Sequence, residues 1–361
     1  MPRPPLLAVT ALLGIVCFVV PVHAQHRDST AAIIEGFPIL SYDSDLGFGY
    51  GGKVVFRNQL GARESFDITA FNSTRGERWY RLAISLPDGE LRHGTVYPWA
   101  VDLIVDYDKM ISNSFYGVGN DARAVDREYY TKEPLDASMA ISRGFTRVLV
   151  GQLGVRFRAV TNTGFDPAGR LLHVADADGR ASYTSLFGMV RYDSRNSTVN
   201  PSTGAVLEGD AEVAPASFPG NTALSRYGLT AQGYVPVFWP ALVLAGRLAF
   251  STVVGDHVPL HFLQSIGGNA TLRGSTQDRY LDRTVAVMNG EFRFPIYKRL
   301  AGIAGIDAGR VWPSAGAVGV SGWTMNPTAG LRVVMETFVV RLDVGFGKET
   351  TGIYFNFGQL F

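Results

Sequence analysis

The sequence predicts an all-β protein, a transmembrane antiparallel β-barrel of about 16 strands. The first observation behind this prediction is a hydrophobic pattern that repeats every second residue along most of the chain. The second is that strand after strand pairs an apolar face with a charged face, and no helical pattern is present to cover the apolar face. The third is an N-terminal segment with the layout of an export signal. A closed barrel in lipid, apolar outside and polar inside, satisfies all three.

Residues 1–24 are predicted to be a secretory signal peptide. Arg3 supplies its positive charge, residues 6–20 are apolar, and Ala24 occupies the small-residue cleavage position. The alternative is a membrane anchor, but an apolar run of about 15 residues is short for a spanning helix. The only cysteine, Cys17, lies in this run, so a mature chain without disulfides or thiolate metal sites is expected. Export to the bacterial outer membrane follows from this reading.

Residues 25–36 are predicted to be a short periplasmic lead-in, and residues 37–361 to form the barrel. The segment VVRLDVGF at residues 339–346 illustrates the alternation, because Arg341 and Asp343 stand opposite an apolar face. A soluble β-sandwich also alternates, but whole domains of that kind usually end near about 250 residues. About fifteen strand candidates instead favour a barrel with an even number of strands. Aromatic residues near strand ends are expected to form interfacial girdles, namely Tyr97, Trp99, Trp239, Trp312 and Trp323.

The segment YFNFGQLF at the end of the sequence is predicted to be the last strand of the barrel. An amphipathic strand that ends on an aromatic residue is typical of the signal that the general barrel assembly machinery reads in its clients. The residues assigned to this signal are Tyr354, Phe355, Phe357 and Phe361, and the three phenylalanines are expected to share one face.

The sequence gives no positive indication of an enzyme, a metal site or a cofactor. GFGYGGK at residues 47–53 lacks the Ser or Thr and the helix of a phosphate-binding loop. DADG at residues 176–179 lacks the remaining ligands of a calcium loop. Without the signal peptide, 32 basic residues balance 32 acidic residues, so there is no electrostatic case for nucleic-acid binding. We therefore expect a protein that has no cofactor and contacts outer-membrane lipid.

A charged, glycine-rich insert, IGGNATLRGSTQDRYLDR at residues 266–283, interrupts two membrane-like segments. It resembles the loop signature of the bacterial surface antigen barrels, the outer-membrane assembly factors of BamA/TamA type. Ser275 departs from that signature, which has Phe or Tyr after Arg-Gly. Further similarities follow in the family's order: FPILSYDSDLGFGYG, FYGVGN, YDSRNSTVNPSTG, GEFRFPI, GIDAGRVW, RLDVGF and the final YFNFGQLF.

The resemblance implies that this loop folds back into the lumen and that its arginine contacts acids on the following strands. Carried over, the arginine is Arg273 beside Gly274, the acids are Glu291 and Asp307, and the loop glycines are Gly267 and Gly268. The residue pattern supports the acids separately. Glu291 alternates with Phe292, and Asp307 alternates with Ile306, so both carboxylates are expected to point inward.

The resemblance also implies a function, the insertion or translocation of proteins at the outer membrane through a weak seam between the first and last strands. That seam is expected between residues 46–57 and residues 351–361. No stretch of sequence corresponds to POTRA domains, so we expect a separate periplasmic partner beside client outer-membrane proteins. Two alternatives remain open at this point: a passive pore or structural surface barrel without insertase activity, and a barrel-embedded lipid hydrolase.

Overall fold

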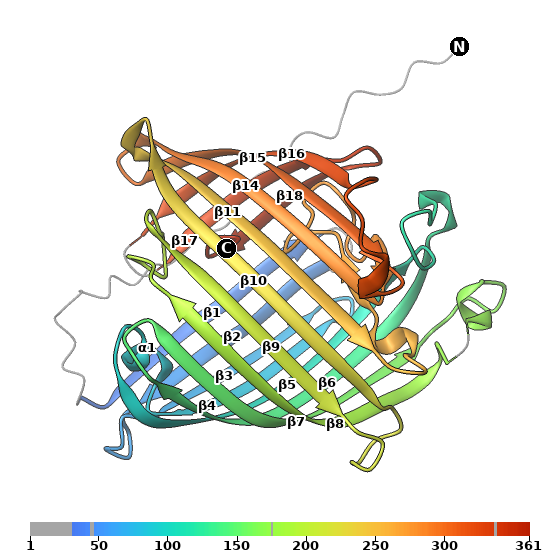
Figure 1. The fold of residues 1–361 in the computed structure, drawn as a ribbon, viewed down its shortest axis with the longest axis horizontal. Helices are drawn as coiled ribbons and strands as arrows, with labels where there is room; N and C mark the ends of the chain where they lie inside the picture. Colours follow the sequence, from blue (N-terminus) through green and yellow to red (C-terminus); the bar gives the residue numbers. More distant parts are fainter. Residues whose placement is uncertain (1–30, 44–46, 175, 336–337) are drawn as a thin grey trace.

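The computed structural model describes residues 31–43, 47–174, 176–335 and 338–361. The predicted signal peptide and residues 25–30 of the predicted lead-in lie outside this range. Within it, sixteen strands form one antiparallel sheet that curves into a barrel (Figure 1). No helix of the described residues is long and apolar enough to cross a membrane. The predicted all-β barrel of about 16 strands is confirmed.

The sheet runs in chain order from β1 to β11 and then from β14 to β18. Its strands are β1 (Ile33–Asp43), β2 (Gly47–Arg57), β3 (Ser65–Ser73), β4 (Arg78–Leu86), β5 (Tyr97–Phe115), β6 (Glu128–Gly144), β7 (Leu149–Thr163), β8 (Gly179–Asp193), β9 (Gly204–Ala214), β10 (Leu224–Val237), β11 (Trp239–Val254), β14 (Thr284–Tyr297), β15 (Leu300–Trp312), β16 (Thr324–Val334), β17 (Val339–Phe346) and β18 (Thr351–Phe357). A separate small hairpin consists of β12 (Gln264–Ile266) and β13 (Tyr280–Asp282). The short helices are α1 (Gly89–Arg92), η1 (Ala124–Asp126), η2 (Leu171–His173), η3 (Leu260–Phe262) and η4 (Ala315–Ala317).

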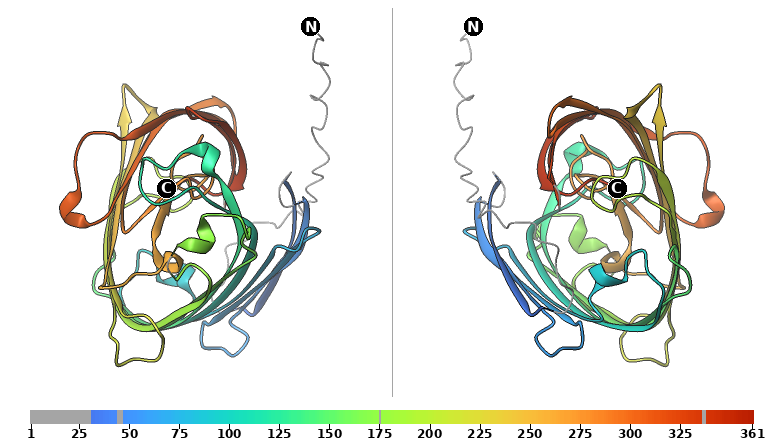
Figure 2. Two further views of the ribbon diagram at one scale, coloured as in Figure 1. Left: turned by 90° about the vertical axis from the view of Figure 1, so that its right-hand side faces the viewer. Right: turned by 90° about the vertical axis from the view of Figure 1, so that its left-hand side faces the viewer.

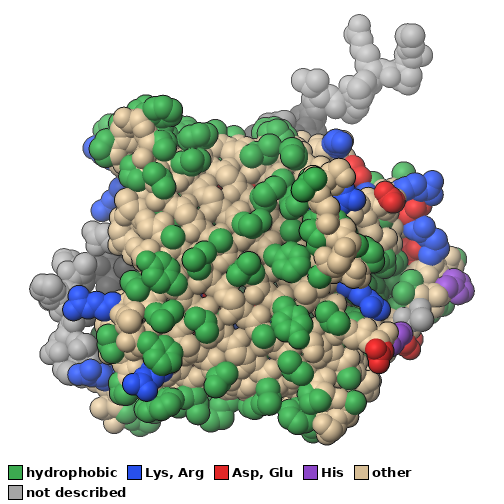
Figure 3. All heavy atoms as spheres, in the orientation of Figure 1, with side chains coloured by type: hydrophobic (Ala, Val, Ile, Leu, Met, Phe, Trp, Pro, Cys, Tyr) green, Lys and Arg blue, Asp and Glu red, His purple; other side chains and the backbone are tan. Residues whose placement is uncertain are grey.

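The two faces of the sheet differ as the alternation predicts. In β14, Met288 and Phe292 are exposed on the outside, whereas Glu291 and Arg293 are buried inside. Figure 3 shows hydrophobic side chains spread across the middle of one outer face, with Lys and Arg gathered toward its two ends. Acyl chains replace water around this face, so exposed apolar side chains are favourable there. The polar side chains line the lumen.

The aromatic girdle is only partly as expected. Trp99 and Trp239 are exposed, which fits a position at the membrane surface. Tyr97 and Trp312 are buried, so the expectation is wrong for these two rings. Tyr97 lies beneath Arg92, whose guanidinium is 5.8 Å from the ring centroid, and Trp312 packs edge-on against Trp323 at 5.6 Å.

The N-terminal boundary of the barrel needs a correction. Strand β1 begins at Ile33, so residues 33–36 of the predicted lead-in already belong to the sheet. They pair in register with β2, from Ile33 opposite Arg57 to Asp43 opposite Gly47. Residues 37–51, FPILSYDSDLGFGYG, resemble the family's first barrel strand. In the structure the described residues of this stretch belong to two strands, because Gly47 begins β2 instead of continuing β1.

The two edge strands of the sheet, at its opposite ends, are β1 and β18. Among the described residues no ladder joins these two strands, and Figure 2 shows the blue β1–β4 wall turning away from the ring of the other strands. The predicted seam is correct on the side of residues 351–357. It is wrong on the other side, because β2 is paired with both β1 and β3.

The long connection between β11 and β14, residues 255–283, lies inside the barrel, where Figure 2 shows it in orange within the ring of strands. Its first part packs against the adjacent wall of strands β7–β11, where Phe262 lies edge-on against Tyr183 of β8 at 4.8 Å. Its central part packs Ile266 and Leu272 against valines of β14 and β15. The predicted loop in the lumen is thus confirmed.

Candidate functional site: a loop bound to the lumen wall

The tip of the lumen loop has a backbone that only glycine accommodates easily. Gly267 has a φ of 137° and Gly274 has a φ of 89°. A Cβ on Gly267 would lie 2.1 Å from the carbonyl oxygen of Thr276, and one on Gly274 would lie 2.7 Å from the backbone of Gly345. The loop therefore turns tightly and then lies flush against β17. Gly268, with a φ of 72°, continues the turn.

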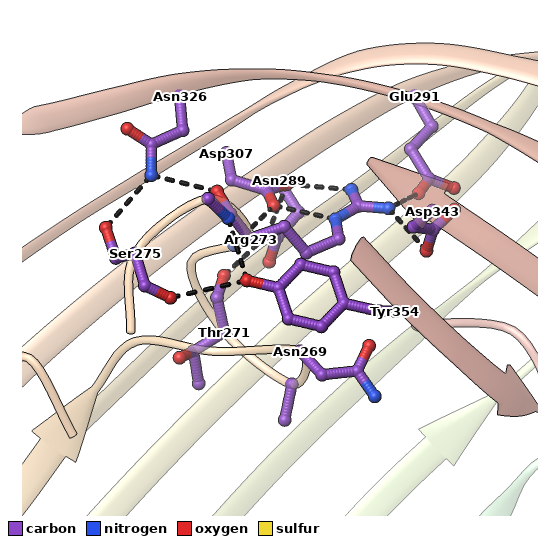
Figure 4. Close-up of polar contacts among 12 residues, drawn as sticks. Asn269, Thr271, Arg273, Ser275, Asn289, Glu291, Asp307, Asn326, Asp343 and Tyr354 are labelled. Carbon is purple, nitrogen blue, oxygen red and sulfur yellow. Dashed lines mark hydrogen bonds and ion pairs between the residues drawn. The ribbon is translucent and has the colours of Figure 1, made fainter. Parts of the chain in front are cut away.

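Arg273 projects from this turn into a group of three carboxylates on three different strands (Figure 4). Its Nε and Nη2 donate to Asp307 Oδ2 and Oδ1 at 2.8 and 2.9 Å, a bidentate pair. Its Nη1 donates to Glu291 Oε1 at 2.9 Å and to Asp343 Oδ2 at 3.0 Å. All four side chains are completely buried. The structure thus brings together Arg273, Glu291 and Asp307, the three residues carried over from the resemblance.

Asp343 is a functional residue that the sequence analysis did not assign to the site. It lies on β17, seventy positions after Arg273 in the chain. The signal was present, because the alternation placed Asp343 with Arg341 on the polar face of residues 339–346. Strand pairing brings it near the loop. Asp343 lies opposite Gly330 of β16, and Gly330 lies opposite Ile303 of β15, four residues before Asp307.

Neutral side chains hold the backbone of the loop around Arg273. Asn326 Nδ2 donates to the carbonyl oxygen of Arg273 at 2.8 Å and to Ser275 Oγ at 3.0 Å. Asn289 Nδ2 donates to Asp307 Oδ1 at 2.7 Å and to the carbonyl oxygen of Thr271 at 2.9 Å. Ser275, the departure from the family signature, is buried in this network. Its hydroxyl accepts a hydrogen bond that an aromatic ring in the same place would not.

The side chain of Tyr354 belongs to this site. The backbone N–H of Gly274 donates to the Tyr354 hydroxyl at 3.0 Å, and that hydroxyl donates to the carbonyl oxygen of Ser275 at 3.3 Å (Figure 4). Its neighbours Ile353 and Phe355 are exposed on the outer face of β18. We call the contacts of Arg273 and its loop with Glu291, Asp307, Asn326, Asp343 and Tyr354 the lumen lock. The last strand therefore contributes one side chain to the lumen lock and two to the lipid-facing surface.

The grouping predicted for the final phenylalanines is wrong for Phe361. Strand β18 ends at Phe357, and Gly358 has a φ of 83°, which turns the chain away from the sheet. Phe361 is buried against Tyr234, with ring centroids 6.4 Å apart, and the guanidinium of Arg293 lies 5.0 Å from its ring centroid. Residues 358–361 thus cross the lumen mouth to β10 and β14. The side chain of Phe357 lies outside the described residues.

Four further arginines surround the three carboxylates. Arg293 Nε lies 3.0 Å from Glu291 Oε2, Arg332 is paired with Asp343 and lies 3.5 Å from Glu291, and Arg341 Nη1 lies 3.4 Å from Asp343 Oδ2. Arg247 Nε donates to Asn289 at 2.9 Å. Glu291 and Asp343 therefore have cationic partners besides Arg273. Among the contacts of the described residues, Asp307 has Arg273 as its only guanidinium within 4 Å.

A second ion pair ties the far end of the loop to its neighbours. Arg279 donates bidentately to Glu349 at 2.6 and 2.7 Å and to the carbonyl oxygen of Ala122 at 2.6 Å. Its guanidinium also lies 4.7 Å from the Tyr116 ring centroid. The hydrogen bonds from Arg279 hold the pKa of the Glu349 carboxyl below its usual value. The segment FYGVGN, which was singled out in the sequence, therefore packs against the loop.

The chemistry of this site is that of attachment. It contains guanidinium, carboxylate, amide and phenol groups that pair with one another, and no group of three or more His, Cys, Asp or Glu side chains in the described parts of the chain could hold a metal ion. What the arrangement can do is fix one loop to five consecutive strands, through Glu291, Asp307, Asn326, Asp343 and Tyr354.

Comparisons with known proteins agree with this architecture. The Omp85 superfamily domain matches residues 47–361. BamA from Haemophilus ducreyi lacking POTRA domains 1-3 is similar in structure, with a TM-score of 0.65 and 13% identity over 90% of this chain and 69% of that one. CdiB from Escherichia coli (TM-score 0.63, 13% identity) and from Acinetobacter baumannii (0.55, 14%) also match 90% of this chain, which spans 61% and 58% of theirs. No curated protein matches the chain.

Proposed function

Because the chain belongs to the Omp85 superfamily, we propose that it inserts proteins into the bacterial outer membrane or translocates them across it. The family match confirms the resemblance that the loop motif indicated. The similar solved structures, at 13 to 14% identity, establish the fold alone. That this chain acts on other outer-membrane proteins as its clients is part of the proposal.

The observation that carries the proposal is that the sheet has two edge strands, β1 and β18. In the described residues no hydrogen-bonded ladder joins them. A strand edge in lipid is costly, because water is absent and backbone N–H and C=O groups need partners. A client strand that pairs there gains those hydrogen bonds by β-augmentation. Glycines in β2, such as Gly51 and Gly52, lower the strand propensity of the wall next to β1.

The lumen lock gives this edge a rigid support. Arg273 binds strands β14, β15 and β17 at once, and Tyr354 extends the attachment to β18 itself. We propose that the lock holds β14–β18 as a fixed template while the β1 side moves. A buried arginine paired with several carboxylates suits this role, because breaking such a pair costs about 3–5 kcal/mol.

Photo-crosslinking tests the proposal directly. A photoreactive amino acid replaces Ile34 on β1 or Ile353 on β18, whose side chains are 63% and 72% exposed. Leu153 on β7 is the matched control, because it is 73% exposed but lies in the middle of the sheet. We expect adducts with newly exported outer-membrane proteins at positions 34 and 353 only. Equal adducts at all three positions, together with unchanged barrel levels after depletion, would refute an insertion role.

A passive pore or surface barrel is the second candidate, and one observation favours it. The wall from β4 to β10 carries charged pairs that face the lumen away from the lock, such as Arg81 with Asp106 and Arg156 with Glu212. Such a wall is typical of a water-filled channel. Conductance in planar bilayers before and after deletion of residues 267–283 distinguishes a plugged channel from a solid lumen. We propose no catalytic activity and no cofactor for either candidate.

A further inference from the structure

The connection between β15 and β16, residues 313–323, carries no charged side chain along its sequence PSAGAVGVSGW. It lies at the end of the barrel that holds the long connections, residues 116–127, 164–178 and 255–283. Outer-membrane barrels have short periplasmic turns and long extracellular loops, so this end faces the outside of the cell. Loop 116–127 at the same end has four charged residues, Asp121, Arg123, Asp126 and Arg127.

The loop at residues 313–323 points away from the lumen. Figure 2 shows it, in red-orange, leaving the barrel wall and projecting outward, and Figure 1 shows it in front of the outer face of the barrel. Val320 is 98% exposed and Val318 is 46% exposed, although both are apolar. In water such exposure is unfavourable. Because the loop lies outside the barrel wall, these side chains can face acyl chains instead of water.

The base of the loop is built on the lipid-facing surface. Trp312 and Trp323 pack edge-on at 5.6 Å, and Trp323 Nε1 donates to the carbonyl oxygen of Gly319 at 3.3 Å. Arg310, on the outer face of β15, donates to the carbonyl oxygen of Ser321 and lies 5.7 Å from the Trp312 ring centroid. The one cation at the base is therefore bonded to the backbone of the loop.

The apolar surface of the loop continues the wall that touches acyl chains. Ile306 of β15 and Met325 of β16 are 47% and 55% exposed on the outer face below the loop. From these observations we propose that residues 313–323 insert into the outer leaflet, with Val318 and Val320 among the acyl chains and half-buried Trp323 at the interface. The partner of this surface is the lipid itself.

A fluorescent probe at position 320 tests the insertion. In a Cys17→Ser background, Val320→Cys is labelled with an environment-sensitive dye and the barrel is reconstituted into vesicles with or without bromine on the acyl chains. We expect bromine to quench the dye and aqueous iodide to leave it largely unquenched. Val125→Cys is the matched control, because Val125 is 84% exposed at the same end among charged residues. Its dye should respond to iodide and not to bromine. The same response at position 320 would overturn the proposal.

A second variant separates insertion from mere proximity to lipid. With the dye at Val318→Cys, Val320→Asp adds a charge that the acyl-chain region disfavours, whereas Val320→Leu does not. We expect the dye to move to an aqueous environment in Val320→Asp only. Heat-modifiable migration on gels checks that each barrel is folded. A dye that stays quenched by bromine in folded Val320→Asp would contradict the proposal.

Discussion

The two ends of the sheet are held in different ways. At the C-terminal end, strands β14–β18 are joined by their ladders and also by a third element, the lumen loop, through completely buried Arg273 and its carboxylates. At the N-terminal end, strands β1–β4 have their ladders and ion pairs between neighbours, such as Lys53 with Asp67, whose side chains are 41% and 25% exposed. Buried pairs are costly to break, whereas exposed pairs contribute little. We therefore expect the C-terminal end of the sheet to be the more rigid of the two.

The largest expected effect comes from Arg273→Ala. Asp307 would lose the one guanidinium that lies within 4 Å of it among the described residues, whereas Glu291 would keep Arg293 and Asp343 would keep Arg332. We expect docking of the loop to weaken by about 3–5 kcal/mol while the barrel stays folded. Proteinase K added to reconstituted protein should cut residues 255–283 faster, with heat-modifiable migration unchanged.

Arg81→Ala is the matched control for that variant, since Arg81 pairs with Asp106 in the N-terminal half of the wall at 36% and 27% exposure. Its effect on cleavage of the loop should be nil. Equal protection of the loop in wild type and Arg273→Ala would show that the carboxylate cluster does not lock it.

A smaller loss is expected from Gly345→Ala. A Cβ at this position on β17 would lie 2.4 Å from the backbone of Arg273 and Gly274. Overpacking of this kind costs about 1–3 kcal/mol. Gly290→Ala is the control, because a Cβ there meets nothing within 4 Å. The loop should be cleaved faster in the first variant only. Since both changes act on one contact, Arg273→Ala combined with Gly345→Ala should fall short of additivity.

Tyr354→Phe should have a weaker effect again. It removes one hydroxyl that bonds Gly274 and Ser275, a contribution of about 0.5–1.5 kcal/mol. Hydrogen exchange of the peptide that contains Gly274 should rise. Tyr107→Phe removes a hydroxyl bonded to Glu133 at 2.8 Å on the opposite wall and should leave that peptide unchanged. Identical hydrogen exchange of this peptide in the two variants would show that the Tyr354 hydroxyl does not contribute to the lumen lock.

The smallest effect is expected from Lys53→Ala, which breaks the exposed pair with Asp67 between β2 and β3. We expect a change of about 0–1 kcal/mol, and less at high salt. Hydrogen exchange in wild type sharpens the comparison, because amides of β1–β4 should exchange faster than those of β14–β18. Uniform protection around the sheet would mean that the two ends are equally rigid.

Much of the barrel and part of the site could be predicted from the sequence. The alternation placed Glu291, Asp307 and Asp343 on inward faces, and the motif around Arg273 indicated which loop would meet them. The motif named two of its three carboxylates, because no local signal relates residue 343 to residue 273. The hairpin of β1 and β2 was missed, since the sequence of residues 37–51 resembles one glycine-rich strand.

What the sequence by itself determined is the direction in which each strand residue points. Successive side chains of an extended backbone alternate between the two faces, so lipid-facing Phe292 and lumen-facing Glu291 follow from local order. Only the tertiary structure decided which inward groups meet. The register across β14–β18 brings Asp343 to Arg273, the close approach at Gly345 seats the loop, and the turn at Gly358 sends Phe361 to Tyr234. Such meetings depend on the stagger and curvature accumulated over several strands, which no single segment encodes.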